Sequence, residues 1–131
     1  MACLDSDFMV DLLRMNPTAH AKLGALLSNG MGVCTTAISA SELFEGAYLS
    51  ARPAETMQRV RGLLDRLIIL DFDFAAADIY GRLSAGLKRK GQDMADFDLA
   101  IASIALSRKE VLITKNMKHF ARIDGLMLDS W

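Results

Sequence analysis

The chain has 131 residues, of which 15 are basic, 16 are acidic and 52% are hydrophobic. This length suits one domain, because single cores usually split only beyond about 250 residues, and it allows a sizeable core without staples. The apolar fraction excludes intrinsic disorder. The net charge of −1 excludes a protein that binds nucleic acid or membranes by bulk charge alone. We therefore expect one domain over residues 1–131.

The sequence lacks the features of an exported or membrane protein. No stretch approaches the roughly 20 apolar residues that span a bilayer. Asp5, Asp7 and Asp11 stand where a signal peptide needs a basic end and a clean apolar run. Cys3 and Cys34 lie in apolar runs far from any CxxC pattern, so we expect two buried free thiols. These features predict a cytoplasmic protein with no membrane contact.

Short apolar runs alternate with longer amphipathic stretches, which is typical of an α/β fold. The predicted strands are Met1–Leu4, Gly32–Thr36, Leu67–Leu70, Val111–Ile113 and an edge strand at Leu126–Leu128. The predicted helices are Asp7–Arg14, Pro17–Leu27, Ser39–Ser50, Ala54–Arg66, Asp73–Lys90, Asp96–Arg108 and Asn116–Phe120. The four residues Leu67–Leu70 resemble a buried parallel strand. The pattern predicts a short, mainly parallel sheet of four to five strands wrapped by about six to seven helices.

In such sheets, functional groups gather at the carboxyl ends of the strands. Asp5 follows the first predicted strand, and the turn Thr114–Asn116 follows the fourth. Glu42 lies in the helix after the second strand, and Asp98 lies in the helix before the fourth. These positions are the candidates for a common site.

Charge is uneven along the chain. Residues 81–122 hold nine basic and four acidic side chains, so this segment carries +5 and the remainder −6. Carboxylate oxygens suit Mg²⁺ or Mn²⁺, and neighbouring Lys and Arg attract a polyanionic backbone. The uneven charge is therefore compatible with a metal-dependent phosphodiesterase, although any one of these lysines can equally be part of a solvated helix face.

Each candidate acid also has a local structural explanation. Asp5 can cap the first helix, and the run from Ser39 to Glu42 fits a capping box in which the Glu reaches back to the Ser backbone. Asp98 heads an inward stripe of small and apolar residues, so its carboxylate needs a partner or a metal. Asp96, two positions earlier, is better explained as an N-cap or first-turn acid.

Four ordered stretches resemble the PIN-domain family, and within it the VapC-type toxins of toxin–antitoxin modules. They are CLDSDFMVDLL, TTAISASELFEGA, MADFDLAIASIAL and VLITKNMKHFARIDGLMLDSW. The resemblance runs nearly end to end and keeps the order of the family's motifs. It implies a PIN-like three-layer α/β/α sandwich.

By this resemblance the family's acids fall on Asp5, Glu42 and Asp98, and its fourth acidic position falls at or near Asn116. The family's acids hold one or two divalent cations, here Mg²⁺ or Mn²⁺, and its enzymes hydrolyse RNA with a metal-activated water. Such in-line attack leaves 5′-phosphate and 3′-hydroxyl ends. Asn116 adds no negative charge, which puts a second tightly bound metal in doubt. The resemblance further implies a homodimer that a VapB-type antitoxin inhibits.

Several residues are candidates for supporting roles. The hydroxyls of Ser6 and Thr114 can orient Asp5, Asn116 or a phosphate, and Asp96 joins the site only if its helix starts after it. His20 and His119 have no spacing that suggests a ligand pair, so we expect both at the surface. The candidates for guiding the RNA backbone are Lys88, Arg89, Lys90, Lys115 and Lys118.

Two other function classes compete with a nuclease. Asp5-Ser6-Asp7 resembles the nucleophile motif of haloacid-dehalogenase-type phosphatases, but Met9 stands where that family has Thr or Val. The other alternative is a PIN-like protein-binding module with weak or no catalysis. In that case apolar helices would form a groove for a partner helix or be plain core. Their candidate side chains are Phe8, Met9, Leu12, Leu13, Phe44 and Tyr48.

Overall fold

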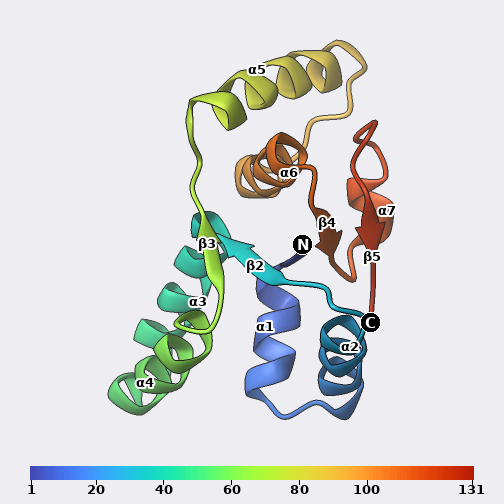
Figure 1. The fold of residues 1–131 in the computed structure, drawn as a ribbon. Coiled ribbons are helices and arrows are strands. Elements are labelled where there is room, and N and C mark those ends of the chain that lie inside the picture. Colours follow the sequence, from blue (N-terminus) through green and yellow to red (C-terminus); the bar gives the residue numbers. More distant parts are fainter.

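The structure, a computed structural model, describes all 131 residues. Its strands are β1 (Ala2–Leu4), β2 (Val33–Thr36), β3 (Ile68–Leu70), β4 (Val111–Ile113) and β5 (Leu128–Asp129). The helices are α1 (Ser6–Leu13), α2 (Pro17–Ser28), α3 (Ala37–Leu49), α4 (Pro53–Leu64), α5 (Phe74–Arg89), α6 (Asp96–Arg108) and α7 (Met117–Phe120). Figure 1 shows their arrangement. The predicted α/β class and element order are confirmed.

The five strands form one parallel sheet in the order β3-β2-β1-β4-β5. The first strand of the chain therefore lies at the centre. There Cys3 pairs with Cys34 of β2 on one side and with Leu112 of β4 on the other. Cys3 and Cys34 are both buried and free, as predicted.

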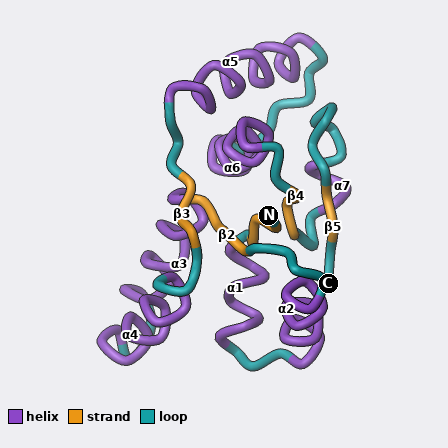
Figure 2. The backbone as a smooth tube through the Cα atoms, in the orientation of Figure 1, coloured by secondary structure: helices purple, strands orange, loops and turns teal.

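Side-chain alternation along the central strands builds the two cores. Ala2 and Leu4 of β1 face one way and join a cluster with side chains of α1, α2, α3 and α4. Cys3 and Leu112 face the other way and pack with side chains of α5, α6 and α7. Figure 2 shows the short strands between these two groups of helices. This arrangement is the predicted three-layer α/β/α sandwich.

The start of α3 differs from the prediction in a way that bears on function. The N-cap is Thr36, whose Oγ1 accepts a hydrogen bond from the Ser39 backbone N over 2.9 Å. The helix therefore begins at Ala37, directly after β2, and the predicted start at Ser39 was wrong. A capping box between Ser39 and Glu42 does not form, which leaves the Glu42 carboxylate free for other contacts.

The last strand also lies later than predicted. The segment after α7 is still turning at Gly125, whose φ of 84° favours glycine. Leu126 belongs to this turn, because its backbone N donates to the carbonyl of Ile123. Pairing with β4 begins only at Leu128 and continues at Asp129. The predicted edge strand at Leu126–Leu128 is therefore shifted.

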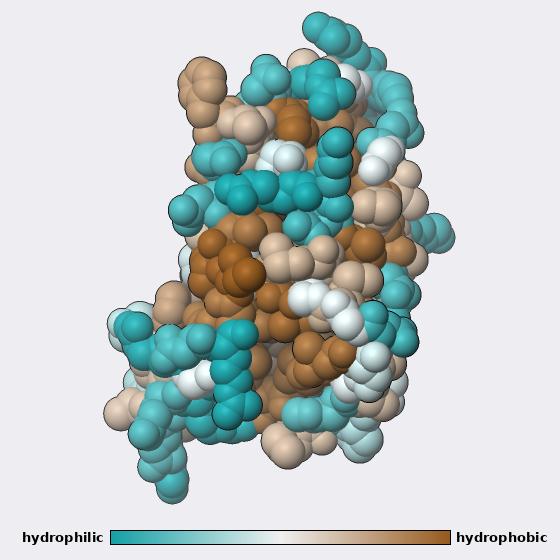
Figure 3. All heavy atoms as spheres, viewed as in Figure 1, coloured by the Kyte–Doolittle hydropathy of each residue, from teal (hydrophilic) through white to brown (hydrophobic).

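The opposite edge strand, β3, is more exposed than a buried parallel strand. Ile68 and Ile69 are 56% and 39% exposed, and only Leu70 is buried. Phe74, at the start of α5, is 92% exposed. Figure 3 shows the hydrophobic surface that gathers over β3. The prediction of a buried strand here was wrong for Ile68 and Ile69, since β3 has a sheet neighbour on one side only. No helix has the length and apolar composition needed to cross a bilayer.

Candidate active site

Three neighbouring central strands bring the candidate residues to one edge of the sheet. Asp5 follows β1, Thr114 follows β4, and α3 with Glu42 begins directly after β2. The helix α6 leads into β4, so its first turn, with Asp98, lies at the end where the parallel strands finish. The carboxyl ends of these strands therefore define one site, as the strand order requires.

Asp5 is the most buried of the acids. It is 8% exposed, and its Oδ1 caps α1 by accepting a hydrogen bond from the Phe8 backbone N over 3.0 Å. The pKa of Asp5 is raised to about 6, mainly by burial and to a smaller extent by the charges of Asp7 and Glu42, against hydrogen bonds from Thr114 and the Phe8 N–H that lower it. Capping and a functional role are thus compatible in Asp5.

Glu42 points from α3 towards the start of α1. Its Oε1 accepts a hydrogen bond from the Ser6 hydroxyl over 3.2 Å. Burial raises the pKa of Glu42, and the charges of Asp98 and Asp7 add to this, whereas the Ser6 hydrogen bond lowers it. Ser6 therefore lies where the sequence placed a supporting hydroxyl, and its partner is Glu42.

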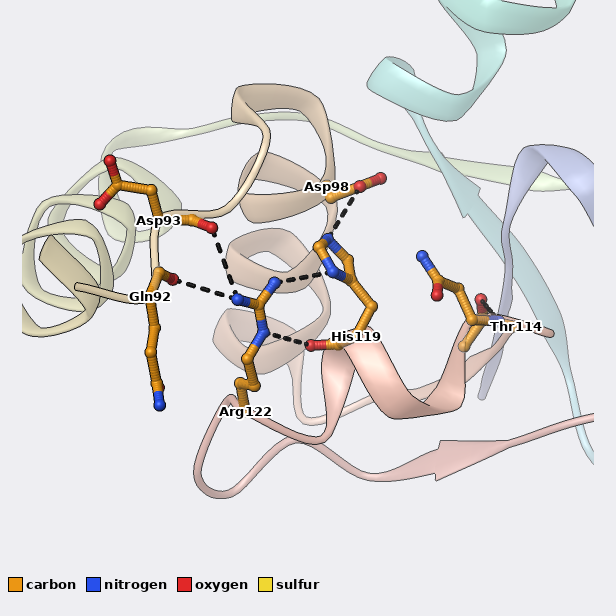
Figure 4. Close-up of polar contacts among 7 residues, drawn as sticks. Gln92, Asp93, Asp98, Thr114, His119 and Arg122 are labelled. Atoms are coloured by element: carbon orange, nitrogen blue, oxygen red, sulfur yellow. Dashed lines mark hydrogen bonds and ion pairs between the residues drawn. The ribbon is translucent and has the colours of Figure 1, made fainter. Parts of the chain in front are cut away.

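Asp98 lies in the first turn of α6 and has an unexpected partner. Its Oδ2 is 3.2 Å from Nε2 of His119 in α7, and both side chains are partly buried. Figure 4 shows the His119 ring between Asp98 and Arg122. The expectation that His119 lies at the surface was wrong, since its side chain is partly buried against Asp98. His20 is exposed as expected, with its Nε2 bonded to the Leu12 carbonyl.

The turn after β4 carries the fourth position of the site. Thr114 is fully buried, and its Oγ1 accepts a hydrogen bond from the backbone N of Asn116 over 3.0 Å. Because Thr114 also contacts Asp5, it links this turn to β1. Asn116 is exposed at the start of α7, and its side chain makes no capping hydrogen bond.

Asp96 does not join the other acids. It is the first residue of α6, is exposed, and its Oδ1 accepts a hydrogen bond from the Tyr80 hydroxyl of α5 over 3.2 Å. This contact raises the pKa of Tyr80, after the larger effect of that residue's burial. The structure thus agrees with the first-turn interpretation of Asp96.

The candidate RNA-guiding residues fall into two groups. Lys88, Arg89 and Lys90 are exposed at the end of α5, and Lys118 is exposed on α7. Lys115 is also exposed, but its ammonium already has partners: its Nζ is 3.0 Å from Oδ2 of Asp11 and 4.8 Å from the centre of the Trp131 ring.

Trp131 fixes the end of the chain against α1. Its Nε1 donates to Oδ2 of Asp11 over 2.9 Å, and its ring meets the edge of Phe8 at 4.7 Å. The hydrogen bond from Trp131, followed by that from Lys115, lowers the pKa of Asp11. The sequence predicted no role for Asp11. Its carboxylate connects α1 to Trp131 at the end of the chain and to Lys115 in the turn after β4.

The donor set of the site suits a hard divalent cation. Asp5, Glu42 and Asp98 supply carboxylate oxygens, which Mg²⁺ and Mn²⁺ prefer. Burial raises the pKa of Asp5 and of Glu42, and neighbouring carboxylates add to this, so a cation would favour the ionised forms of both. No three His, Cys, Asp or Glu side chains converge into a ready cluster of ligands. Each carboxylate is instead turned to its own partner: Phe8 N–H, Ser6 or His119.

A groove of about 420 Å³ opens beside the acids, between α1, α3 and α4. Ser6, Asp7 and Glu42 line it next to the site, and Arg14 and Arg59 line it as well. Leu13 belongs to its apolar lining, whereas Phe8, Met9 and Leu12 are buried in the core. Of the two alternatives for these side chains, Leu13 therefore fits the groove and the other three fit the core.

The residues that sequence reasoning missed are His119, Arg122 and Asp11. The spacing of His119 and Arg122, three apart, indicates that they share one face of a helical turn. Nothing in the sequence indicates that this face meets Asp98, 21 positions earlier. Asp11 likewise gives no local indication of its contact with Trp131, 120 positions away.

The sequence and fold match known proteins along most of their length. The family model described as the PIN domain matches residues 2–126. The chain is 30% identical over 128 residues to the tRNA(fMet)-specific endonuclease VapC of Shigella flexneri, covering 98% of this chain and 96% of that one. It is 37% identical over 103 residues to the Salmonella typhimurium protein of the same name, with 79% and 78% covered.

The fold is similar to solved toxin–antitoxin complexes. The toxin-like chain of VapBC2 from Rickettsia felis, bound to a DNA fragment from its promoter, superposes with a TM-score of 0.92 at 29% identity, covering 99% of this chain and 98% of that chain. The matching chain of DNA-bound VapBC from Salmonella typhimurium gives a TM-score of 0.89 at 32% identity, covering 99% and 97%.

Proposed function

The chain belongs to the PIN-domain family and to its VapC ribonuclease branch, and from this premise we propose that it is a metal-dependent endoribonuclease, the toxin of a toxin–antitoxin pair. We propose one catalytic domain over residues 1–131, since one sheet contains both β1 and β5. Family membership leaves the phosphatase alternative without support.

The observation that carries the proposal is the gathering of Asp5, Glu42 and Asp98 at the carboxyl edge of the central strands. These acids come from positions far apart in the chain, and Asp5 and Glu42 have pKa values raised by burial and by their acidic neighbours. Such an arrangement is unfavourable without a cation and is typical of a functional site. It supports Asp5, Glu42 and Asp98 as the residues that would hold Mg²⁺ or Mn²⁺.

When bound, the cation supplies a more acidic water and offsets charge on the phosphodiester oxygens. One of the chain's own carboxylates would take the proton of the attacking water. Ser6 orients Glu42, Thr114 orients Asp5, and the exposed amide of Asn116 would hydrogen-bond a substrate phosphate. In-line hydrolysis leaves 5′-phosphate and 3′-hydroxyl ends.

The RNA backbone approaches the site along exposed cations. Lys88, Arg89, Lys90 and Lys118 are exposed and free to meet phosphates, which Lys and Arg bind without reading sequence. Two similar proteins are named for initiator tRNA, tRNA(fMet). This RNA is therefore the first substrate to test.

We further propose that a VapB-type antitoxin segment binds in the groove between α1, α3 and α4. The groove joins an apolar lining to the acids Asp7 and Glu42, which suits an amphipathic segment with a basic side chain. The solved relatives are VapBC complexes. Binding here would cover Glu42 and so inhibit cleavage.

Homodimerisation is supported by the apolar edge at β3. Ile68, Ile69 and Phe74 are too exposed for a surface that faces only water, and an uncovered sheet edge invites pairing. The measurement is light scattering with Ile68→Lys as the test variant. A wild-type chain that is monomeric at all concentrations would contradict this part of the proposal.

The catalytic proposal is tested with purified chain and a panel of RNAs that includes initiator tRNA, other tRNAs and an unstructured RNA. We expect cleavage with Mg²⁺ or Mn²⁺, none with EDTA, and 5′-phosphate products. Asp5→Asn and Asp98→Asn should each reduce the rate by about a hundredfold or more, since even residues behind the ligands contribute 10–100-fold. Asp78→Asn, on the exposed face of α5, is the matched control. Equal rates for Asp5→Asn and wild type would overturn the assignment.

A further inference from the structure

His119 is the point at which three parts of the chain meet beside Asp98. Its Nε2 lies 3.2 Å from Asp98 Oδ2 of α6, and its Nδ1 lies 2.7 Å from Nη2 of Arg122. Figure 4 shows the three side chains in a row, with the imidazole in the middle. No other side chain of the protein forms an ion pair or a hydrogen bond with the Asp98 carboxylate, so the contact with His119 is its one polar partner.

The contact with Arg122 decides which ring nitrogen of His119 carries the proton. A guanidinium has only donors, so Arg122 Nη2 donates and Nδ1 of His119 accepts. In the neutral ring the proton is therefore on Nε2, the nitrogen that lies 3.2 Å from Asp98 Oδ2. Arg122 thus fixes the tautomer that can hold the carboxylate, as a carbonyl or carboxylate does behind many catalytic histidines.

Arg122 is itself fixed by main-chain groups. Its Nε donates to the carbonyl of His119 over 3.2 Å, and its Nη1 donates to the carbonyls of Gln92 and Asp93 over 3.3 and 3.5 Å. These carbonyls belong to α7 and to the segment that leads into α6. The planar fork of an arginine can bridge such separate acceptors, and a lysine cannot. The His119 ring is therefore held in register with the start of α6.

The orientation of the Asp98 carboxylate depends on His119 because its position in the helix provides few other contacts. It lies in the first turn of α6, and its side chain is 34% exposed. The contact of His119 Nε2 with Oδ2 at 3.2 Å restricts the carboxylate rotamer and leaves Oδ1 without a partner in the chain. Oδ1 is the oxygen free to meet a cation shared with Glu42, whose pKa the charge of Asp98 raises.

We propose that His119, held by Arg122, is a positioning residue that orients Asp98 for divalent-cation binding. The inference rests on the proposed function, since it takes Asp98 as a metal ligand. His119 touches neither the cation nor the reacting phosphate. Its effect is on how tightly the site holds the ion.

The test measures Mn²⁺ binding to the purified chain without RNA. Electron paramagnetic resonance gives the concentration of the free ion. His119→Gln keeps a donor for Asp98 and an acceptor for Arg122, while His119→Ala keeps neither. We expect His119→Ala to weaken Mn²⁺ binding by about 10- to 100-fold and His119→Gln to stay within about threefold of wild type. His20→Ala, at the other histidine, should leave binding unchanged.

Two further variants separate positioning from a general loss of structure. Arg122→Leu retains the ring and removes the donor to Nδ1, so we expect an intermediate loss of Mn²⁺ affinity. His119→Asn has the chemistry of His119→Gln but is one methylene shorter, and it should not restore binding. In RNA cleavage, excess Mn²⁺ should recover most of the turnover of His119→Ala, because a positioning residue shifts the metal dependence more than the rate at saturation.

The outcomes distinguish this inference from the proposed function. If wild type binds Mn²⁺ more tightly than Asp98→Asn, and His119→Ala binds it as tightly as wild type, the positioning role is overturned and the nuclease proposal stands. If His119→Ala does not fold, Arg122→Leu takes its place in the test. Equal Mn²⁺ affinity of Arg122→Leu and wild type then overturns the positioning role. If Asp98→Asn binds Mn²⁺ as wild type does, the proposed site fails and this inference with it.

Discussion

The hydroxyl of Ser6 donates a hydrogen bond to Oε1 of Glu42 over 3.2 Å, which joins the first residue of α1 to the middle of α3. The two residues are 36 positions apart and meet because β1 and β2 are neighbours that end at one edge. This bond favours the ionised form of Glu42, since it lowers the pKa that burial raises.

Ser6→Ala is expected to reduce RNA cleavage through Glu42. Loss of a hydrogen bond to a charged group costs about 1.5 kcal/mol or more. A loss of this size in transition-state stabilisation corresponds to roughly tenfold in rate. The pKa of Glu42 should rise, so the deficit should grow as the pH is lowered from 8 to 5.5. The measurement is kcat/KM for a fluorogenic RNA across this range. Ser6→Thr retains the hydroxyl and should retain the rate, and a pH-independent deficit in Ser6→Ala would argue against this account.

Asp5 makes the metal-free protein less stable as the pH rises. Its folded pKa of about 6 exceeds the ordinary value of 3.8, so between these values the native state binds more protons than the unfolded state. Stability from this group is therefore present below about pH 4 and lost as the pH rises through 6. A shift of about two units corresponds to roughly 3 kcal/mol. We expect Asp5→Asn, which keeps an N-cap, to become more stable than wild type by this order above pH 6.

The measurement is urea unfolding of wild type and Asp5→Asn in EDTA from pH 4 to 7. The difference between the two proteins isolates Asp5, because the other carboxyl groups are common to both. Added Mg²⁺ should restore wild type and have a smaller effect on Asp5→Asn, since the cation stabilises the ionised carboxylate. A difference that stays constant from pH 4 to 7 would show that Asp5 titrates normally.

Local patterns were sufficient for most of the fold. The parallel sheet and the helix order follow from apolar runs and amphipathic stretches, and Pro17 and Asp73 mark where two helices begin. The predicted strand ends also make Asp5, Glu42 and Asp98 candidates for one site. The start of α3 was less accessible, because Thr36 and Ser39 are both good caps and only pairing of β2 with its neighbours selects Thr36.

The partners of the site were beyond local sequence reasoning. His119 becomes a partner of Asp98 only because β1 and β4 are paired and α6 and α7 flank the same end of β4. Arg122 is held by the backbone carbonyls of Gln92 and Asp93, and the positions of backbone carbonyls cannot be predicted from residue types. Exposure of Ile68 and Ile69 depends on β3 being at the edge, which strand order alone decides. Long-range contacts therefore account for each of these differences.

Trp131 is expected to contribute to stability through both its ring and its N–H. Trp131→Ala loses the contact with Phe8 and the bond to Asp11, and we expect a loss of about 2–3 kcal/mol in the free energy of unfolding, less than for a fully buried Trp. Trp131→Phe loses mainly the hydrogen bond and should lose about 1 kcal/mol. Urea unfolding measures both. Leu49→Ala, at a 79% exposed position, is the control and should change stability by less than about 0.5 kcal/mol; an equal effect of Trp131→Ala and Leu49→Ala would contradict the anchoring role.

The basic residues should divide into those that bind RNA and one that supports the fold. Lys118 is exposed and makes no hydrogen bond, whereas Lys115 is engaged by Asp11 and lies over Trp131. In an Asp5→Asn background that does not cleave, binding of single-stranded RNA is measured by fluorescence anisotropy at several salt concentrations. Each lost phosphate contact lowers the slope of log affinity against log salt by about 0.7. We expect Lys118→Ala and Lys88→Ala to lower the slope by this amount, and Lys115→Ala to leave the slope unchanged while lowering stability. The reverse result would mean that RNA displaces Asp11 from Lys115, and that the turn after β4 contacts the substrate directly.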